Sequence, residues 1–266
     1  MTHIAGTLGG VYTGVALLIH ACEDTWNEQV VGGVALSTST GKVGTYAATA
    51  TTTGVGATTV LMSEAITKDL STYEAACWWA KCDIETTAGT LQLLLSEAQN
   101  CATPAESLNI APLTAATWHH CFGIFTGTTA SRNAIISVGI YQVTDLANLV
   151  FDVDDVEALN EITGIKSWTL DYTVGVVDVT DFGSTGTRDV LPAVSQWSGS
   201  FEGYKDGVPL SIGTEYYLTM GESNTDYQGW LGKAVITGAH PNVAFDGSVS
   251  YSYDFEGTAA LETPSA

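Results

Sequence analysis

Short runs of β-branched, aromatic and aliphatic residues recur along the whole chain, and clusters of Gly, Asn, Asp, Ser and Thr separate them. This pattern is typical of strands in an all-β sandwich or barrel, whereas the spacing of an amphipathic helix is scarce. The sequence therefore predicts an all-β fold. In the first half we expect strands at 46–50, 57–62, 76–84, 90–98, 117–125 and 134–143, which suffice for a two-sheet sandwich.

One more strand is expected where the first half ends. In residues 150–155, VFDVDD, the side chains of Asp152 and Asp154 fall on one face and those of Phe151 and Val153 on the other, which predicts a half-buried strand. A boundary follows at about residues 160–164. We therefore expect a first domain over 1–161 and a second over 162–266.

The second half carries long strands of a different composition. Large Trp197 and Phe201 alternate with small residues in WSGSFEGY, so one face packs bulk while the backbone approaches a neighbour on the other. The KDG that follows is a hairpin-turn signal. The segment 168–183 predicts a long strand or a bent pair, and 215–222, 227–241 and 245–261 complete the set.

The charge is strongly unbalanced, because 29 acidic residues face 8 basic ones for a formal net charge of −21. Binding to phosphates by counterion release needs clustered Lys and Arg, so we do not expect sequence-specific nucleic-acid binding. An acidic wall could instead repel a polyanion that passes along it. Solubility, or adaptation to a saline medium, explains the same composition equally well.

We expect no enzymatic activity, and no catalytic or cofactor-binding residue is assigned. The sequence has no Walker loop, dinucleotide fingerprint or HExxH. His119 and His120 are adjacent in an expected strand and point to opposite faces, which disfavours a joint metal site. The five cysteines include no CxxC, and an odd number fits a reducing compartment. No stretch is apolar for long enough to span a bilayer, and the N-terminus lacks the basic region of a signal peptide.

The segments ACEDTW, GKVGTYAATAT, PLTAATWHHCFGIF and FDVDDVEAL lie in the first half. In these segments it resembles the carbohydrate-binding-module-like jelly rolls appended to many viral and bacterial surface proteins. The resemblance implies a jelly-roll β-sandwich. Some members hold a structural calcium, and the candidate ligands here are Glu23, Asp24, Asp154 and Asp155. The simpler interpretation is that these carboxylates are solvated at a sheet end.

An ordered set of segments occupies residues 165–261: WTLDYTVGVVDVTDFGSTGTRDVLPAVSQWSGSFEGYKDG, then YLTMGE, then GKAVITGAHPNVAFDGSVSYSYDFEGTAAL. This half resembles the tail tube (major tail) proteins of tailed phages and viruses. The resemblance implies a β-sandwich or barrel whose long hairpins join neighbours into a ring, usually hexameric, and rings that stack into a tube. It makes the loop 181–196 a candidate inter-ring contact. The assembly candidates are Trp168, Leu170, Val174, Arg188, Leu191, Trp197 and Phe201.

Together the two resemblances imply a virion structural protein, made in the host cytoplasm, whose jelly roll faces outward from the tail tube. Expected partners are further copies of itself, other tail proteins such as the tape measure and terminators, and viral DNA that passes without sequence-specific binding. A host-surface glycan is a further candidate, which Trp78, Trp79 or Trp118 would stack on; no membrane insertion is expected. The alternatives are a carbohydrate-binding surface protein with two β-sandwich domains and a capsid decoration protein.

Overall fold

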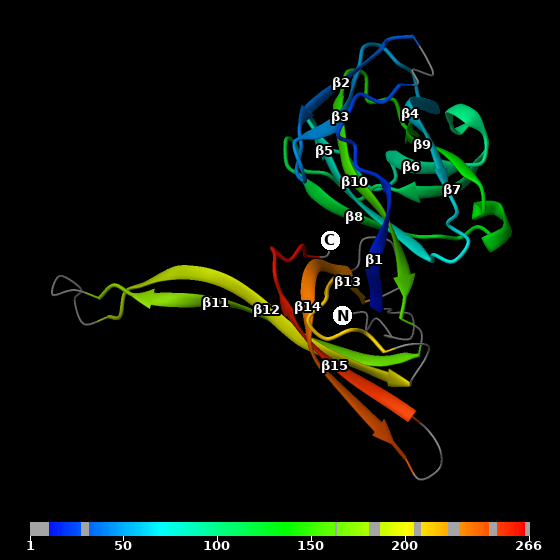
Figure 1. Cartoon of the computed structure of the whole chain (residues 1–266). Coiled ribbons are helices and arrows are strands. Elements are labelled where there is room, and N and C mark those ends of the chain that lie inside the picture. Colours follow the sequence, from blue (N-terminus) through cyan, green and yellow to red (C-terminus); the bar gives the residue numbers. More distant parts are fainter. Residues whose placement is uncertain are drawn as a thin grey trace, which may run out of the picture.

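The computed structural model describes residues 11–27, 32–162, 164–180, 187–204, 209–222, 229–244 and 249–263 (Figure 1). Within these ranges the chain is almost entirely strand and turn, with two short 3-10 turns, so the predicted all-β fold is confirmed. No helix among the described residues is both long and apolar enough to cross a membrane. The elements are β1 (Val11–His20), β2 (Val34–Thr40), β3 (Tyr46–Thr52), β4 (Thr59–Lys68), β5 (Ala75–Cys82), β6 (Leu91–Ser96), η1 (Gln99–Cys101), β7 (Pro104–Asn109), β8 (His119–Ile124), η2 (Thr129–Arg132), β9 (Ile135–Gln142), β10 (Val150–Glu161), β11 (Ile165–Asp178), β12 (Val190–Tyr204), β13 (Glu215–Gly221), β14 (Gly229–Val243) and β15 (Val249–Gly257).

The first half is a sandwich of two antiparallel sheets. One sheet runs β4-β9-β6-β7, and the other contains β8, β5, β10, β3 and β2, with β10 paired to both β5 and β3. Alternate side chains of both sheets meet between them and form the larger core, which includes Trp26, Trp78 and Phe151. The period-2 pattern of the sequence thus produces the sandwich directly.

Strand β10 corrects one expectation. We predicted a half-buried strand at 150–155, but Asp152 and Asp154 are buried as well as Phe151 and Val153. The physical reason is that both side chains have polar partners inside the fold: Asp152 accepts from the hydroxyls of Ser39 and Thr49 and pairs with Lys81, and Asp154 Oδ2 accepts two backbone N–H groups. A polar residue in alternation therefore does not always mark a solvent face.

The second half forms the sheet order β11-β12-β15-β14-β13, all antiparallel. Its core gathers Trp197 and Phe201 of β12 with Phe255 of β15. Two glycines make room for the Trp197 ring, because a Cβ at Gly232 or Gly257 would collide with the indole. In WSGSFEGY, Trp197 therefore packs into the core where the neighbouring strands carry glycine, and Phe201 packs against the rings of Tyr253 and Phe255.

Strand β1 lies between the two halves. Its first residues, Val11 to Gly14, pair with β13 on one side, and β10 pairs along its other side from Tyr12 to His20, so one sheet continues from the sandwich into the second half. A third small cluster fills the junction, and it includes Tyr12 of β1, Phe122 of β8 and Tyr217 of β13. An N-terminal strand thus bonds to both halves, a connection that periodicity along the chain does not reveal.

Candidate assembly interface

Strands β11 and β12 extend beyond the body as a long two-stranded ribbon (Figure 1). We define the arm as the described residues 171–180 and 187–196, all of which are exposed. At about 3.3 Å per residue, ten residues of each strand make a ribbon roughly 30 Å long. We predicted residues 190–196 as part of a loop; the structure instead places them in β12, and 181–186 lie outside the described residues.

The arm exposes a large apolar surface. Val194 is 83% exposed, Leu191 57%, Val176 56% and Val177 53%. Among its described residues the charged ones are Asp171, Asp178, Arg188 and Asp189, and Arg188 pairs with Asp178 at 3.0 Å. Apolar side chains dominate a ribbon that has no core of its own, which is the pattern of a surface that becomes covered by a partner.

The outer edge of β11 is open. Among the described residues β11 pairs with β12 alone and ends the sheet. An unpaired edge of 14 residues presents a row of backbone N–H and C=O groups to any incoming strand. A two-stranded ribbon is marginally stable in water by itself. Backbone and side chains of the arm therefore both favour association with another chain.

The predicted assembly residues divide into two groups. Val174, Arg188 and Leu191 are exposed on the arm, as an assembly contact requires. Trp168 and Leu170 pack partly buried against the second core, and Trp197 and Phe201 lie inside it. The cross-strand register explains the division, because Trp168 pairs with Phe201 at the core end of the ribbon, whereas Val177 pairs with Leu191 farther out.

Other exposed apolar residues of the arm were not among the predicted assembly residues, namely Tyr172, Val176, Val177, Val179, Val190 and Val194. A signal for them existed in the sequence. In VGVV and DVLPAV the hydrophobic residues do not alternate with polar ones, so neither face of the ribbon is consistently polar. A bulge between Val174 and Val176 also shifts the register, which alternation alone could not place.

The second sheet also has a polar face, opposite its core. Asp171, Ser198 and Glu256 form one row across β11, β12 and β15. Thr169, Ser200 and Asp254 form the next row, in which the Ser200 and Thr169 hydroxyls lie 3.1 Å apart. These residues border a shallow pocket of about 510 Å³. The face offers hydroxyls and carboxylates and is acidic.

The four calcium candidates do not act as one site. Glu23 accepts hydrogen bonds from the backbone N–H groups of Thr45 and Tyr46 at 2.9 and 3.0 Å. Asp154 accepts from the backbone N–H groups of Lys42 and Val43 at 2.8 and 2.9 Å, and burial raises its pKa. Both carboxylates thereby hold the turn between β2 and β3.

The other two candidates have different surroundings. Asp24 is exposed, and Asp155 accepts a hydrogen bond from the Tyr217 hydroxyl at 3.4 Å. Within the described residues no three His, Cys, Asp or Glu side chains are grouped so that they could hold a metal ion. The donor set therefore does not fit calcium, which prefers six to eight oxygen ligands.

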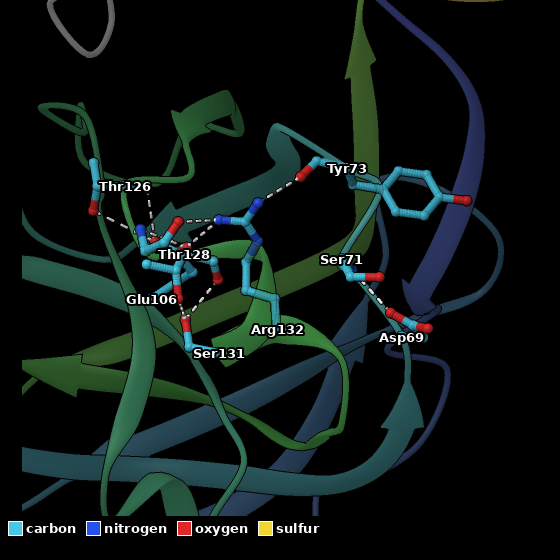
Figure 2. Close-up of polar contacts among 9 residues, drawn as sticks. Asp69, Ser71, Tyr73, Glu106, Thr126, Thr128, Ser131 and Arg132 are labelled. Carbon is cyan, nitrogen blue, oxygen red and sulfur yellow. Dashed lines mark hydrogen bonds and ion pairs between the residues drawn. The ribbon is translucent and has the colours of Figure 1, made fainter.

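A buried ion pair joins β7 to the segment that contains η2 (Figure 2). Arg132 donates to Glu106 Oε1 at 2.9 Å, and their side chains are 5% and 0% exposed. Glu106 also accepts the backbone N–H groups of Thr126 and Gly127, and Arg132 also donates to the carbonyl of Tyr73. These bonds hold the loop before η2 against β7. Sequence reasoning missed this pair, since 26 residues separate its members.

The remaining polar and aromatic candidates of the first half make contacts within the fold. The His120 ring stacks on Trp79 at 4.5 Å, and burial lowers its pKa to about 3, so it is neutral. His119 accepts the backbone N–H of Thr114. Trp78 is buried in the first core, and the Lys81 ammonium lies 4.7 Å from the Trp118 ring. All five cysteines are buried and reduced, and burial raises the pKa of Cys121 to about 12.

No protein-family model matches the chain, and no curated protein matches it either. Solved structures do. A chain from the tail of an empty gene transfer agent particle, refined with C6 helical symmetry, is 19% identical with a TM-score of 0.35, over 40% of this chain and 87% of that one. A chain from the virion of a native gene transfer agent is 20% identical with a TM-score of 0.33, over 41% and 89%.

A third similar structure is the tandem CBM22-1–CBM22-2 domain of Xyn10C from Paenibacillus barcinonensis. It is 10% identical with a TM-score of 0.36, over 92% of this chain and 90% of that one. The similar structures thus come from gene transfer agent particles, one of them from the tail, and from a CBM22 tandem domain. With TM-scores below 0.5, these likenesses do not establish a shared fold for the whole chain.

Proposed function

We propose that this chain is a structural subunit of a virion tail that polymerises with copies of itself. The observation that carries the proposal is the arm, an exposed and largely apolar ribbon whose outer strand, β11, has an open edge. An arm that projects from one part of a subunit and docks on a different part of the next makes a heterologous contact. Such contacts close into rings or continue as filaments.

The rings of this assembly stack into a tail tube, as the resemblance of residues 165–261 to tail tube proteins implies, and six subunits per ring is the expected number. Arms of neighbouring subunits cover each other's apolar side chains and extend each other's sheets. Burying a Val or Leu side chain contributes about 1.5–3 kcal/mol. Several such residues on each arm are enough to offset the translational freedom that a subunit loses on association.

The polar face of the second sheet is the surface that lines the bore in this proposal. Its rows of Asp171, Ser198, Glu256, Thr169, Ser200 and Asp254 supply hydroxyls and negative charge. Like charges keep the phosphates of DNA away from the wall, so the polymer passes without binding. The sandwich of the first half lies outside the tube, and the chain has no catalytic role.

Electron microscopy of the purified full chain at low and high salt, together with light scattering, tests the proposal. The matched variant replaces residues 174–195 by Asn-Gly, which closes the ribbon at the paired residues Thr173 and Gln196 and leaves the core residue Trp197 in place. We expect rings or tubes from the natural chain and a folded monomer from the variant. A natural chain that stays monomeric at all concentrations, or a shortened variant that still forms tubes, contradicts the proposal.

A further inference from the structure

The junction between the two halves has an apolar end and an acidic end. The second half packs there against one face of the larger sheet of the sandwich, through Tyr217 of β13 and Leu231 of β14 (Figure 1). Two neighbouring rows cross β10, β5 and β8 on this face, and only the second contains a carboxylate. The rows are Leu159, Ala75 and Ile124, then Glu157, Cys77 and Phe122. The junction is separate from the arm.

A bulge in β10 places a second carboxylate at the acidic end. The register of β10 against β5 shifts between Asp154 and Glu157. Within the bulge Asp155 has a left-handed φ of 48°, a conformation that few residues other than glycine, Asn and Asp adopt. Asp155 accepts a hydrogen bond from the Tyr217 hydroxyl of the second half at 3.4 Å. An irregular backbone therefore brings two neighbouring acids of the sandwich to the surface that the second half covers.

The acidic end has more negative charge than its positive charge can balance. Among the described residues, the charged groups that act on Glu157 are Asp155 and Lys233. The Lys233 ammonium of β14 lies 4.5 Å from the centre of the Tyr217 ring and can balance one carboxylate. Glu157 Oε2 is buried and has no hydrogen-bond partner within the described part of the chain. A buried, unpartnered oxygen costs far more free energy when it is ionised than when it is neutral.

The other titratable groups at this end supply no further charge. Burial lowers the pKa of His120 on β8 to about 3 and raises the pKa values of the Cys77 thiol and the Tyr217 hydroxyl, so all three are neutral near pH 7. On β1 the neighbour of Glu157 is Leu18. Burial, together with the charge of Asp155, raises the pKa of Glu157 to about 7, and Lys233 lowers it in part.

We propose that Glu157 operates a proton-dependent latch between the two halves: the protonated side chain keeps the acidic end closed, and loss of the proton to solvent opens it. Opening exposes the Glu157 carboxylate to water and moves the second half away from it. The apolar end stays closed as the hinge, because β1 pairs with β13 there from Val11 to Gly14. Since the pKa of Glu157 is raised only while the junction is closed, closure is strongest at acid pH and weakens as the pH rises toward 7.

The thiol of Cys77 reports this opening, because it is 1% exposed and pairs with Glu157 across the strands. Cys82 lies on the same strand, is 0% exposed and faces the first core, so it is the matched control. The full chain is reacted with 4,4′-dithiodipyridine at pH 5.5 and at pH 8, and mass spectrometry identifies the labelled cysteines. We expect the ratio of the Cys77 to the Cys82 labelling rate to rise about 10- to 100-fold between these pH values, after allowance for partial solvent screening.

Variants connect that rise to the latch. Glu157→Gln is neutral at every pH and should keep the ratio at pH 8 as low as at pH 5.5. Asp155→Asn removes the repelling charge but still accepts from Tyr217, and should reduce the rise. Glu202→Gln changes an exposed carboxylate and should leave the rise intact. An unchanged ratio in the natural chain, a full rise in Glu157→Gln, or equal acceleration of both cysteines, which indicates unfolding of the sandwich, overturns the proposal whether or not the chain polymerises.

Discussion

A single charge on the arm should prevent polymerisation without unfolding the subunit, and Val194→Asp is the sharpest form of this test. Val194 is 83% exposed in the isolated chain. Its replacement therefore removes little from the fold, and surface changes of this kind usually alter the free energy of unfolding by less than about 0.5 kcal/mol. We expect a much larger effect on association, because the proposed assembly buries this side chain.

The size of the effect follows from that exposure. Covering 83% of a valine contributes about 1.2–2.5 kcal/mol per contact, and an Asp at the same place adds the cost of taking a carboxylate out of water. A total of about 3 kcal/mol corresponds to a roughly 100-fold rise in the critical concentration for polymerisation. Val194→Ile, which keeps the apolar surface, should leave the critical concentration within about threefold.

Pelleting of polymer over a concentration series measures the critical concentration, and thermal melting checks the fold. Thr38→Asp is the matched control, because it adds the same charge on an exposed residue of β2 in the first sandwich. The reasoning is refuted if Val194→Asp polymerises at the natural concentration. It is also refuted if Thr38→Asp suppresses polymerisation equally, since the effect would then reflect net charge and not the arm.

Three further predictions concern the body of the protein. Arg132→Met leaves the buried Glu106 carboxylate without its ion-pair partner and should lower the free energy of unfolding in urea by about 3–5 kcal/mol. Burial raises the pKa of Glu157 from 4.5 to about 7, so the folded state holds a proton that the unfolded state releases, and stability falls as the pH rises from 4.5 to 7. Glu157→Gln should therefore stabilise the chain by about 1–3 kcal/mol at pH 8, after allowance for partial solvent screening, and by far less at pH 5. Gly139→Ala should displace η1 and lower the free energy of unfolding by about 1–3 kcal/mol, because the added Cβ meets the sulfur of Cys101.

Each of these predictions has a control. Adding Glu106→Leu to Arg132→Met should recover part of the lost stability, because no lone charge stays buried. Glu202 is exposed, so Glu202→Gln is the surface control and should change the free energy of unfolding by less than about 0.5 kcal/mol. Gly32 has open space around its missing Cβ, so Gly32→Ala should cost far less stability than Gly139→Ala. A cost below about 1 kcal/mol for Arg132→Met, an equal effect of Glu157→Gln at both pH values, or an unchanged stability of Gly139→Ala would show the corresponding reasoning to be wrong.

Much of the fold follows from local pattern. Period-2 alternation predicted the strands and the all-β class, and it predicted that Trp197 and Phe201 pack their bulk on one sheet face, as they do in the second core. The position of β1 between β10 and β13 could not be predicted, because pairing partners far apart in sequence leave no local signature. The boundary at 160–164 and the two domains stay predictions, since β1 bonds to both sides of it.

The candidate sites were less predictable for a related reason. Exposure of Val194 and burial of Trp197 differ although both lie in β12, because only the inner end of the strand has a core beneath it. The position of η1 on the four-stranded sheet depends on the missing side chain of Gly139, which leaves room for Cys101, 38 positions earlier in the chain. Residue types gave the chemistry of these side chains, but long-range packing decided which of them face a partner.

Amide hydrogen exchange of the arm, in the unassembled chain and in the polymer, tests the central claim most directly. The account predicts that peptides from 171–180 and 187–196 exchange quickly in the unassembled subunit and become protected on assembly, with the outer edge of β11 among the amides that gain protection. Peptides from β4 and β9 should exchange equally in both states. A polymer in which the arm exchanges as fast as in the free subunit would contradict the assignment of the arm as the assembly element.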